Sequence, residues 1–426
     1  MNLSLSLYRR FLALVTEIFE LFPPRRVDRE EIILRKGQFI PQLPVNPGTI
    51  WVHGASLGET ITLRPFMRQL NKRFGPERIL ATATSMDGLR QIKRDAYAGH
   101  ATLLPIELPE LLDPFIECMK PSILLISETE IWPFLGFYLS KKGIPCGIIN
   151  GRINPKTVKF LQLLHPLFQD TLRSFSFVFA QSQAYAERFR TLGIPSKRIK
   201  VLGSFKFDFE DEKEETGPIL EKFGLSNGKP IFIAGSTHAD EEKQLLDAFE
   251  KCSCMQKFQI VFAPRHLDRI REVANLLTTR KIEFVMSSEL KRPLNNCVLL
   301  LNQLGMLRKL YSVSNLVFVG GSLIPRGGHN ILEPAVYSIP IISGPHTTNF
   351  PQEIRLLKKM NALFTVENSN NLSQLISSFI SDRQPFIESG KRARKALETL
   401  SGASQRTLGI LNQIGLLPDW KPITQN

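Results

Sequence analysis

Cysteine is scarce in this chain of 426 residues, which contains only five. The five are scattered, odd in number and mostly set in apolar or helical runs: Cys118, Cys146, Cys252, Cys254 and Cys297. Cys252 and Cys254 are separated by one serine, a spacing that fits neither a zinc site nor a redox motif. We therefore expect the protein to work in a reducing compartment.

Long apolar runs free of charge are also missing. Two arginines and two glutamates interrupt the apolar residues 7–22, which makes this stretch a poor transmembrane span, and it has no small-residue cleavage site. Its apolar side chains recur at helical spacing: Tyr8, Phe11, Leu12, Val15, Ile18, Phe19 and Phe22. We expect residues 1–26 to form an amphipathic helix on a membrane surface, ended by Pro23-Pro24 and followed by Arg25 and Arg26. A helix packed on its own domain fits the same pattern.

Acidic residues are the minority charge, because 54 Lys and Arg face 40 Asp and Glu, giving a net charge of +14. This excess favours an anionic partner, which could be a nucleic acid, an acidic membrane or a phosphorylated substrate. Composition does not choose among them.

What the chain does contain is a series of short apolar runs alternating with amphipathic helices. The predicted strands are 49–53, 79–84, 101–105, 122–127, 146–150, 177–181 and 199–203, then 230–236, 258–264, 282–286, 297–301, 315–321, 339–343 and 362–366. Such alternation implies parallel sheets covered on both faces. The length favours two domains of roughly 200 residues. The expected divisions are the membrane helix 1–26, an N-terminal domain 27–208, a linker 209–228, a C-terminal domain 229–395 and a helical segment 396–426.

The segment from Gly320 to Phe350 is the richest in chemistry. It follows a strand with a Gly-rich turn, an expected helix and a second strand, an order in which backbone N–H groups can approach a phosphate. We expect the helix to begin near Asn330 as its N-cap and to carry Glu333 in its first turn, where it could bind ribose hydroxyls. A tight turn and a first-turn acid that complements the helix dipole would also explain these residues.

Polar residues gather directly after the predicted strands, which is where doubly wound sheets bind ligands. In the first half these residues are His53, Ser56, Glu59, Glu128 and Glu130. In the second half they are Ser236, Thr237, His238, Arg265, His266, Gly327, Gly328, His329, Asn330 and Glu333. We therefore expect an α/β protein of the GT-B class, with two facing Rossmann-like domains and a cleft between them.

Seven motifs in order give the chain a family resemblance: HGASLGE (53–59), ETEIWP (128–133), GSFKFD (203–208), AGSTHADEE (234–242), PRH (264–266), VGGSLIPRGGHNILEPA (319–335) and GPHTTNF (344–350). The sequence resembles the 3-deoxy-D-manno-octulosonic acid (Kdo) transferases over nearly its whole length. One departure is Phe134, where many members have Asn, so a side-chain amide is lost on the acceptor side.

The resemblance implies an inverting transfer of Kdo from CMP-Kdo to lipid IVA, without metal or other cofactor, at the cytoplasmic face of the inner membrane. It places the general base at Glu59, with His53, Ser56, Glu128 and Glu130 on the acceptor side. His53 could equally be a buried, hydrogen-bonded histidine that supports the loop, and Glu128 and Glu130 could form structural salt bridges near the cleft. Lys206 joins the polar residues of the second half as a donor-binding group, stabilising the CMP phosphate. A membrane surface with anionic lipids is the further expected partner.

Two other functions remain open from the residues alone. A nucleotide-sugar 2-epimerase pairs two similar domains with Gly- and His-rich turns, but it would need no lipid-facing helix. A non-enzymatic basic protein on a membrane or nucleic acid would not need ordered polar residues at strand ends. The chain also lacks the aromatic stacking surfaces of single-strand binders, so we expect no nucleic-acid partner.

Overall fold

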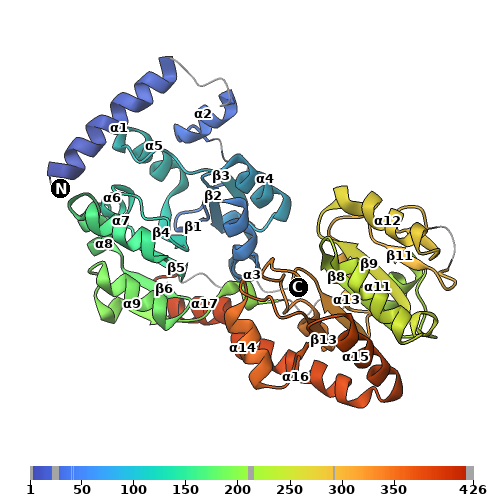
Figure 1. The fold of residues 1–426 in the computed structure, drawn as a ribbon. Helices are drawn as coiled ribbons and strands as arrows, with labels where there is room; N and C mark the ends of the chain where they lie inside the picture. Colours follow the sequence, from blue (N-terminus) through green and yellow to red (C-terminus); the bar gives the residue numbers. More distant parts are fainter. Residues whose placement is uncertain are drawn as a thin grey trace. The chain divides into compact units, whose positions relative to one another are not determined.

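The computed structural model describes residues 3–21, 28–39, 41, 43–209, 215–290 and 293–418. The chain divides into two compact units (Figure 1). Unit 1 consists of Met1–Phe209 and Leu400–Asn426, and unit 2 consists of Glu210–Thr399. The structure thus has two units, as predicted, but residues 400–426 belong to unit 1 together with the N-terminal part of the chain.

Unit 1 is built on a seven-stranded sheet whose recorded pairs are all parallel. Its strands are β1 (Thr49–His53), β2 (Ile79–Ala83), β3 (His100–Leu103), β4 (Pro121–Ser127), β5 (Cys146–Gly151), β6 (Phe177–Ala180) and β7 (Ile199–Val201). Their order in the sheet is β3-β2-β1-β4-β5-β6-β7, the Rossmann order with one strand added. The order reverses between β1 and β4, so a ligand site is expected beyond the ends of these two strands.

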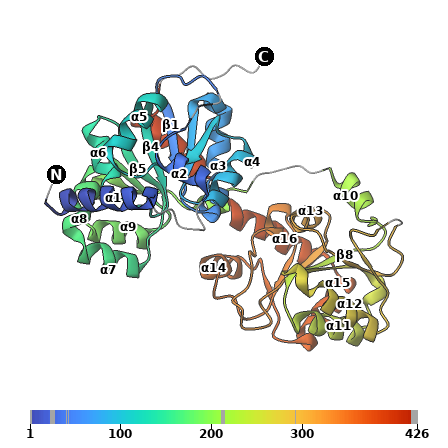
Figure 2. The ribbon, with the colours of Figure 1, turned by 90° about the horizontal axis from the view of Figure 1, so that it is seen from above.

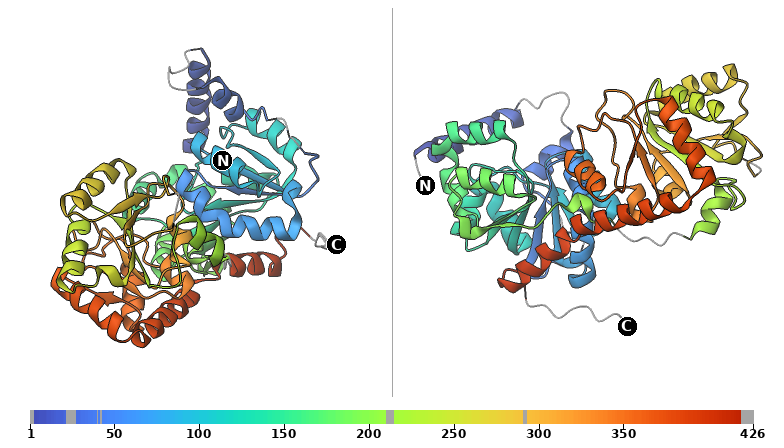
Figure 3. Two further views of the ribbon diagram at one scale, coloured as in Figure 1. Left: turned by 90° about the vertical axis from the view of Figure 1, so that its right-hand side faces the viewer. Right: turned by 60° about the horizontal axis from the view of Figure 1, so that its bottom comes forward.

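Helices cover both faces of this sheet (Figure 3). They are α1 (Leu3–Leu21), α2 (Arg29–Arg35), α3 (Leu57–Phe74), α4 (Met86–Asp95), α5 (Pro109–Met119), α6 (Leu135–Lys141), α7 (Pro155–Leu163), α8 (His165–Ser174), α9 (Gln183–Thr191) and α17 (Ala403–Gln413). Short 3-10 turns are η1 (Pro76–Arg78), η2 (Ser196–Arg198) and η3 (Phe205–Phe207). Because side chains on both faces are buried, the strands read as continuous apolar runs. Trp51 and Leu124 belong to the core on one face, and Val52 and Leu125 to the core on the other.

Unit 2 repeats this plan with a second parallel sheet of seven strands. Its strands are β8 (Ile231–Thr237), β9 (Gln259–Pro264), β10 (Phe284–Met286), β11 (Val298–Leu300), β12 (Leu316–Val319), β13 (Ile341–Ser343) and β14 (Phe364–Thr365). Its helices are α10 (Thr216–Lys222), α11 (Glu241–Lys251), α12 (Ile270–Thr279), α13 (Leu307–Tyr311), α14 (Pro351–Lys359), α15 (Ser369–Ser381) and α16 (Gln384–Leu400), with 3-10 turns η4 (Met255–Lys257), η5 (Leu267–Arg269) and η6 (Pro334–Tyr337). The order β10-β11-β9-β8-β12-β13-β14 reverses between β8 and β12.

All fourteen predicted strands are present, and the Rossmann-like class of both domains is confirmed. The expected linker 209–228 differs from the structure, because it contains α10, whose Ile219 is buried in unit 2. Residues 210–214 of that linker lie outside the described residues. The expected helical segment 396–426 also differs, since α16 continues to Leu400 and only then does α17 begin.

The C-terminal helix α17 is fastened to unit 1, where it packs against α3. The carboxylate of Asp208 accepts hydrogen bonds from the backbone N–H groups of Gly402, Ala403 and Ser404, at 2.6 to 3.1 Å. These are the donors that a helix start leaves without partners, so Asp208 caps α17 from a distant part of the sequence. The GSFKFD motif therefore ends in a structural residue.

The N-terminal helix α1 lies beside α8 (Figure 2). On the packed face of α1, Leu5 is buried, and the Tyr8 hydroxyl donates a hydrogen bond to a carboxylate oxygen of Glu107 at 2.6 Å. The opposite face is apolar and exposed, and we call it the α1 stripe: Leu3, Leu7, Phe11, Leu14 and Ile18. Spacings of three and four residues put these side chains on one side of the helix. Tyr8 was expected on the apolar face, but it belongs to the packed one.

The rest of the predicted membrane segment can be compared only in part. The side chains of Phe19 and Phe22, and residues 23–26 with both expected arginines, lie outside the described residues. Within the described residues, no helix combines the length and hydropathy that crossing a bilayer requires.

Candidate active site

Glu59 lies at the start of α3, directly after β1. Ser56 is the N-cap, and its hydroxyl accepts a hydrogen bond from the Glu59 N–H at 3.3 Å. The Glu59 carboxylate reaches back and accepts from the Ala55 N–H at 2.9 Å. This reciprocal arrangement resembles a capping box, so the Ser-x-x-Glu spacing explains where α3 begins and how Glu59 is oriented.

The electrostatic environment of Glu59 favours a protonated carboxyl group. Burial, together with the charges of Glu130 and Glu128, raises the pKa of Glu59 to about 7, although the Ala55 N–H acts against this. Burial also raises the pKa values of Glu128 and Glu130. Three carboxyl groups thus interact beyond the carboxyl ends of β1 and β4, where the strand order reverses. They cannot all carry full charge at low cost in free energy.

Glu128 has an unusual backbone conformation at the end of β4. Its φ of 56° lies in the left-handed region, which costs a residue with a side chain on the order of 1 kcal/mol or more. The carboxylate of Glu128 accepts from the guanidinium of Arg152 at 2.7 Å. This ion pair makes Glu128 a poorer base than Glu59 and fixes it at the edge of the site.

His53 was expected on the acceptor side, but the structure buries it completely. Its Nδ1 lies 2.9 Å from the Thr82 hydroxyl and its Nε2 lies 3.5 Å from the Thr84 hydroxyl. Burial lowers the pKa of His53 to about 4, so the ring is neutral at pH 7. These contacts favour the alternative of a buried, hydrogen-bonded histidine, which ties β1 to β2 beneath the loop that carries Glu59.

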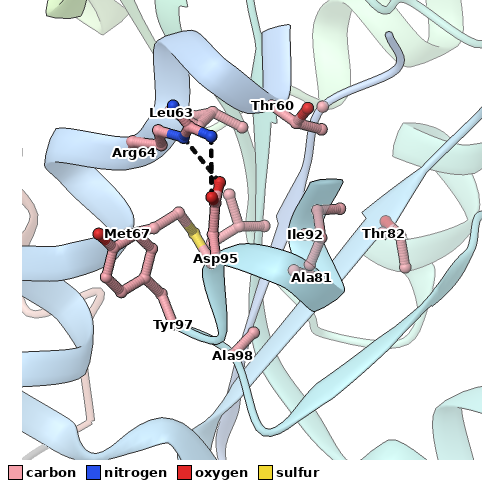
Figure 4. A pocket seen from close by; sticks show the side chains of 12 residues that line it. Thr60, Leu63, Arg64, Met67, Ala81, Thr82, Ile92, Asp95, Tyr97 and Ala98 are labelled. Carbon is pink, nitrogen blue, oxygen red and sulfur yellow. Dashed lines mark hydrogen bonds and ion pairs between the residues drawn. The ribbon is translucent and has the colours of Figure 1, made fainter. Parts of the chain in front are cut away.

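The helix that carries Glu59 is braced against α4. Figure 4 shows the guanidinium of Arg64 facing Asp95, with two hydrogen bonds of 2.8 and 2.9 Å. Met67 and Tyr97 lie beside this pair, at a small cavity of about 20 Å³. A void of that size holds no substrate. This region serves to fix α3 in place.

Phe134 is packed into unit 1. Its side chain is 1% exposed, stacks on Tyr138 with ring centres 5.0 Å apart, and lies beneath the guanidinium of Arg9. Phe134 therefore contacts α1 and the core of unit 1, and it offers no polar side-chain group to an acceptor. Phe134 and Tyr138 instead join α1 to the loop that follows the ETEIWP motif.

Glu107 strengthens the same connection, and sequence reasoning missed it. Its buried carboxylate accepts from the Tyr8 hydroxyl and from the backbone N–H groups of Phe134 and Leu135, at 2.6 to 2.8 Å. Burial raises the pKa of Glu107 to about 7 despite these three donors. No single motif marks Glu107, because its three partners come from two distant segments.

In unit 2, five of the expected residues line a cavity of about 390 Å³. Its walls include Ser236, Arg265, His329, Asn330 and Glu333. The remaining wall residues are Gly305, Leu307, Arg308, Tyr311, Val319 and Phe350. A cavity of this size suits a small ligand, and two arginines in its wall suit an anionic one.

The expected helix at Asn330 is absent. Residues 331–333 form turns, and only the short η6 follows. The Asn330 side chain instead donates to the Glu333 carboxylate at 3.1 Å. Burial raises the pKa of Glu333, while Asn330, Arg308 and Arg265 act in the opposite direction. Glu333 keeps its predicted place at the cavity, although the helix dipole invoked for it does not exist.

The Gly-rich turn is needed for close packing. Gly327 and Gly328 have φ values of 85° and 77°, and a Cβ atom on Gly327 would meet the side chain of Asn349 at 2.7 Å. The Gly328 N–H donates to the Gly321 carbonyl oxygen at 2.8 Å. That N–H was expected to bind phosphate, so this part of the prediction is wrong. Thr237 is likewise fully buried and does not line the cavity.

Glu241 is the second residue that sequence reasoning missed. Its fully buried carboxylate accepts four backbone hydrogen bonds of 2.7 to 3.0 Å, from His238, Gly321, Ser322 and Leu323. One side chain thereby joins the turn after β8 to the turn after β12. The sequence does contain an indication of Glu241, because the AGSTHADEE motif ends in two adjacent acidic residues that follow the turn after a strand. Its neighbour Glu242 forms a two-point ion pair with Arg269.

Three histidines meet at the same end of the unit 2 sheet. The Nε2 atoms of His238 and His329 are 2.7 Å apart, and their rings are nearly parallel, at 7°. The ring centre of His266 lies 5.7 Å from that of His238. Lys206, expected with this group, belongs to unit 1, where its ammonium lies over the ring of Phe207. Across the described ranges, no three His, Cys, Asp or Glu side chains are arranged to hold a metal.

Two Rossmann-like units with polar residues at both switch points define an α/β protein of the GT-B class. A solved UDP-GlcNAc 2-epimerase from Neisseria meningitidis superimposes with a TM-score of 0.59 over 86% of this chain and all of that one, at 15% identity. That similarity shows the fold alone. The particular family comes from sequence relatives.

The family model of 3-deoxy-D-manno-octulosonic-acid transferase (kdotransferase) matches residues 29–209. The transferase of Haemophilus influenzae is 30% identical over 374 residues, covering 86% of this chain and 87% of that protein. The transferase of Aquifex aeolicus is 27% identical, covering 78% and 86%. The chain therefore belongs to the Kdo transferase family and is a glycosyltransferase.

Proposed function

We propose that this enzyme transfers Kdo from CMP-Kdo to a glucosamine hydroxyl of lipid IVA, with inversion and without a metal. The observation that carries this proposal is Glu59, a half-buried carboxyl group with a pKa of about 7 at the β1/β4 switch point. A general base works best when its pKa lies near the working pH. Inversion requires such a base on the face opposite the leaving group.

The acceptor side of this proposal is unit 1. Glu59 takes the proton from the acceptor hydroxyl, and Ser56 holds the start of its helix. Glu130 raises the pKa of Glu59 and binds a sugar hydroxyl of the acceptor, while Glu128 is held by Arg152. His53 supports this loop from below.

The donor side is the cavity of unit 2. Arg265 and the imidazoles of His238, His266 and His329 stabilise the CMP phosphate as it leaves, which removes the need for a metal. Glu333, held by Asn330, binds the ribose hydroxyls. Ser236 lines the same cavity, and Gly327 and Gly328 shape the turn around it. Lys206 belongs to unit 1, and its role as a donor-binding residue stays a prediction.

Membrane attachment is proposed to come from α1. Its stripe is a row of exposed apolar side chains, which cost free energy in water and gain it at a lipid surface. The net charge of +14 favours anionic lipids. A helix that lies on the cytoplasmic face of the inner membrane would bring unit 1 to its lipid acceptor.

The direct test combines the purified protein, CMP-Kdo and lipid IVA, followed by mass spectrometry. The proposal predicts a product heavier than lipid IVA by one or more Kdo residues, formed also in the presence of a chelator. Release of CMP without a glycosylated lipid would show that the acceptor is wrong. A strict requirement for added divalent metal would contradict the metal-free mechanism.

A further inference from the structure

The histidines of unit 2 come from three separate strand ends. His238 follows β8, His266 follows β9 and His329 lies in the turn after β12. The 2.7 Å between the Nε2 atoms of His238 and His329 is a hydrogen-bond distance. One ring must donate an N–H and the other must accept it with a lone pair. Two hydrogens would collide in this space, so the pair can gain one proton, at an outer ring nitrogen, but not two.

The charged groups around the pair are mostly cationic. Arg265, Arg269 and Arg326 lower the pKa of His238 together with His266, after burial as the largest cause. Burial, together with His238, Arg265 and His266, lowers the pKa of His329 to about 4. His346 and Asp240 lie on the adjoining turns and are exposed.

The nearby carboxylates are occupied and offset little of this charge. Glu241 is held by four backbone N–H groups, one of them from His238, and Glu242 is paired with Arg269. Glu333 lies across the cavity and is bonded to Asn330. Without an anion, the histidine pair is therefore neutral near pH 7.

We propose that the His238–His329 pair takes up one proton from solvent when the phosphate of the donor nucleotide binds in the unit 2 cavity. His329, Arg265 and Ser236 all line this cavity, so an anion there lies next to the pair. Its negative charge offsets the repulsion from the arginines and favours the imidazolium form. The proton adds to an outer ring nitrogen, and no other bond changes. This inference rests on the proposed donor site.

Such a pair adds selectivity to charge attraction. A nucleotide phosphate induces the imidazolium that then binds it, whereas a neutral nucleoside does not. Because binding consumes a proton, affinity must fall as the pH rises, by at most about tenfold per pH unit for a single proton. The arginines alone would bind the phosphate without this pH dependence.

The test is calorimetry of CMP binding to the full chain at pH 7.5, in two buffers of different ionisation enthalpy. At this pH the CMP phosphate, with a second pKa of about 6, is already almost fully ionised. The difference between the observed enthalpies gives the number of protons taken up. We expect about half a proton to one proton per CMP for the unaltered chain, and less than about 0.2 for His238→Gln and for His329→Gln. Cytidine should show no uptake.

His165→Gln is the matched control, because His165 is exposed on α8 of unit 1. It should take up as many protons as the unaltered chain. Binding of CMP without proton uptake, or uptake unchanged in both pair variants, would overturn the inference while the donor site stands. No CMP binding by the unaltered chain would overturn the donor site itself. If a pair variant fails to fold, a pH-independent CMP affinity of the unaltered chain between pH 6.5 and 8.5 is the contradicting result.

Discussion

The two units have the same strand plan but opposite chemistry at their switch points. In unit 1, three carboxyl groups meet beyond β1 and β4, and burial raises their pKa values. In unit 2, imidazoles and arginines meet beyond β8 and β12, and burial with like charge lowers the histidine pKa values. Similar scaffolds thus carry a cluster of carboxyl groups in one unit and a cluster of imidazoles and arginines in the other. The difference comes from a few residues after each strand, not from the sheets.

The largest effect is expected from removing the base of unit 1. Glu59→Gln keeps the size of the side chain and part of its capping role, but it cannot accept a proton. We expect transfer to Kdo acceptors to fall by at least ~10²-fold in a steady-state assay. Glu117→Gln, an exposed position on α5, is the control and should retain full turnover. Near-normal turnover of Glu59→Gln would move the base elsewhere, with Glu130 as the next candidate.

A smaller but still large effect is expected on the exposed face of α1. Replacing Leu7, Phe11 and Leu14 by Ser removes apolar area from the α1 stripe while leaving the packed face intact. At about 1.5 kcal/mol or more per side chain, vesicle binding should weaken by at least about 100-fold in sedimentation with anionic lipids. The control replaces three other exposed apolar residues of unit 1 by Ser: Phe160, Leu163 and Val201. Equal loss in both variants would mean that α1 is not the membrane contact.

In unit 2 the next effect comes from Glu241→Gln. The amide offers one accepting oxygen where the carboxylate oxygens accept four N–H groups, and its own NH₂ would face a donor. We expect CMP affinity to fall about tenfold, since the turns after β8 and β12 lose their common anchor. Glu283→Gln, at an exposed position of unit 2, should bind CMP normally. Unchanged affinity in Glu241→Gln would show that the two turns hold their shape without it.

The pH dependence of turnover tests the role of Glu59 in unit 1. Glu59 must be ionised to act, and its pKa is raised to about 7, so at saturating CMP-Kdo the kcat/KM for the lipid acceptor should rise with pH and reach half its plateau near pH 7. Measurement between pH 5.5 and 8.5 checks this. A rate that falls steadily over this range would mean that an acid, not a base, limits the reaction.

The smallest effect is expected at the contact between α1 and Glu107. Tyr8→Phe leaves the buried carboxylate with two donors in place of three. Loss of one hydrogen bond to a charged group costs on the order of 1.5 kcal/mol, or a melting temperature lower by about 3 °C. The pKa of Glu107 is about 7, so the loss should be larger at pH 8, where the group is ionised, than at pH 5.5. A shift independent of pH would show that Glu107 stays protonated throughout.

Much of this organisation could be predicted from the sequence, because buried parallel strands leave continuous apolar runs and their ends carry the polar residues. The capping spacing of Ser56 and Glu59 was equally visible. The absent helix at Asn330 was not, since the proline after Glu333 permits a helix start as well as a 3-10 turn. Glu107 and Asp208 bond partners far away in the sequence, which local patterns do not encode. The loss of an amide at Phe134 could be predicted from the sequence, but its packing against Arg9 and Tyr138 could not, because Arg9 is distant in the sequence.

The central claim is that unit 1 supplies the base and unit 2 binds the nucleotide. Calorimetry of CMP binding to the full-length Glu59→Gln and Glu333→Ala variants tests it most directly. We predict an unchanged Kd for Glu59→Gln and a Kd raised by at least about tenfold for Glu333→Ala, whose carboxylate we assign to the ribose. Weakened CMP binding in Glu59→Gln together with unchanged binding in Glu333→Ala would contradict the claim and reverse the roles of the two units.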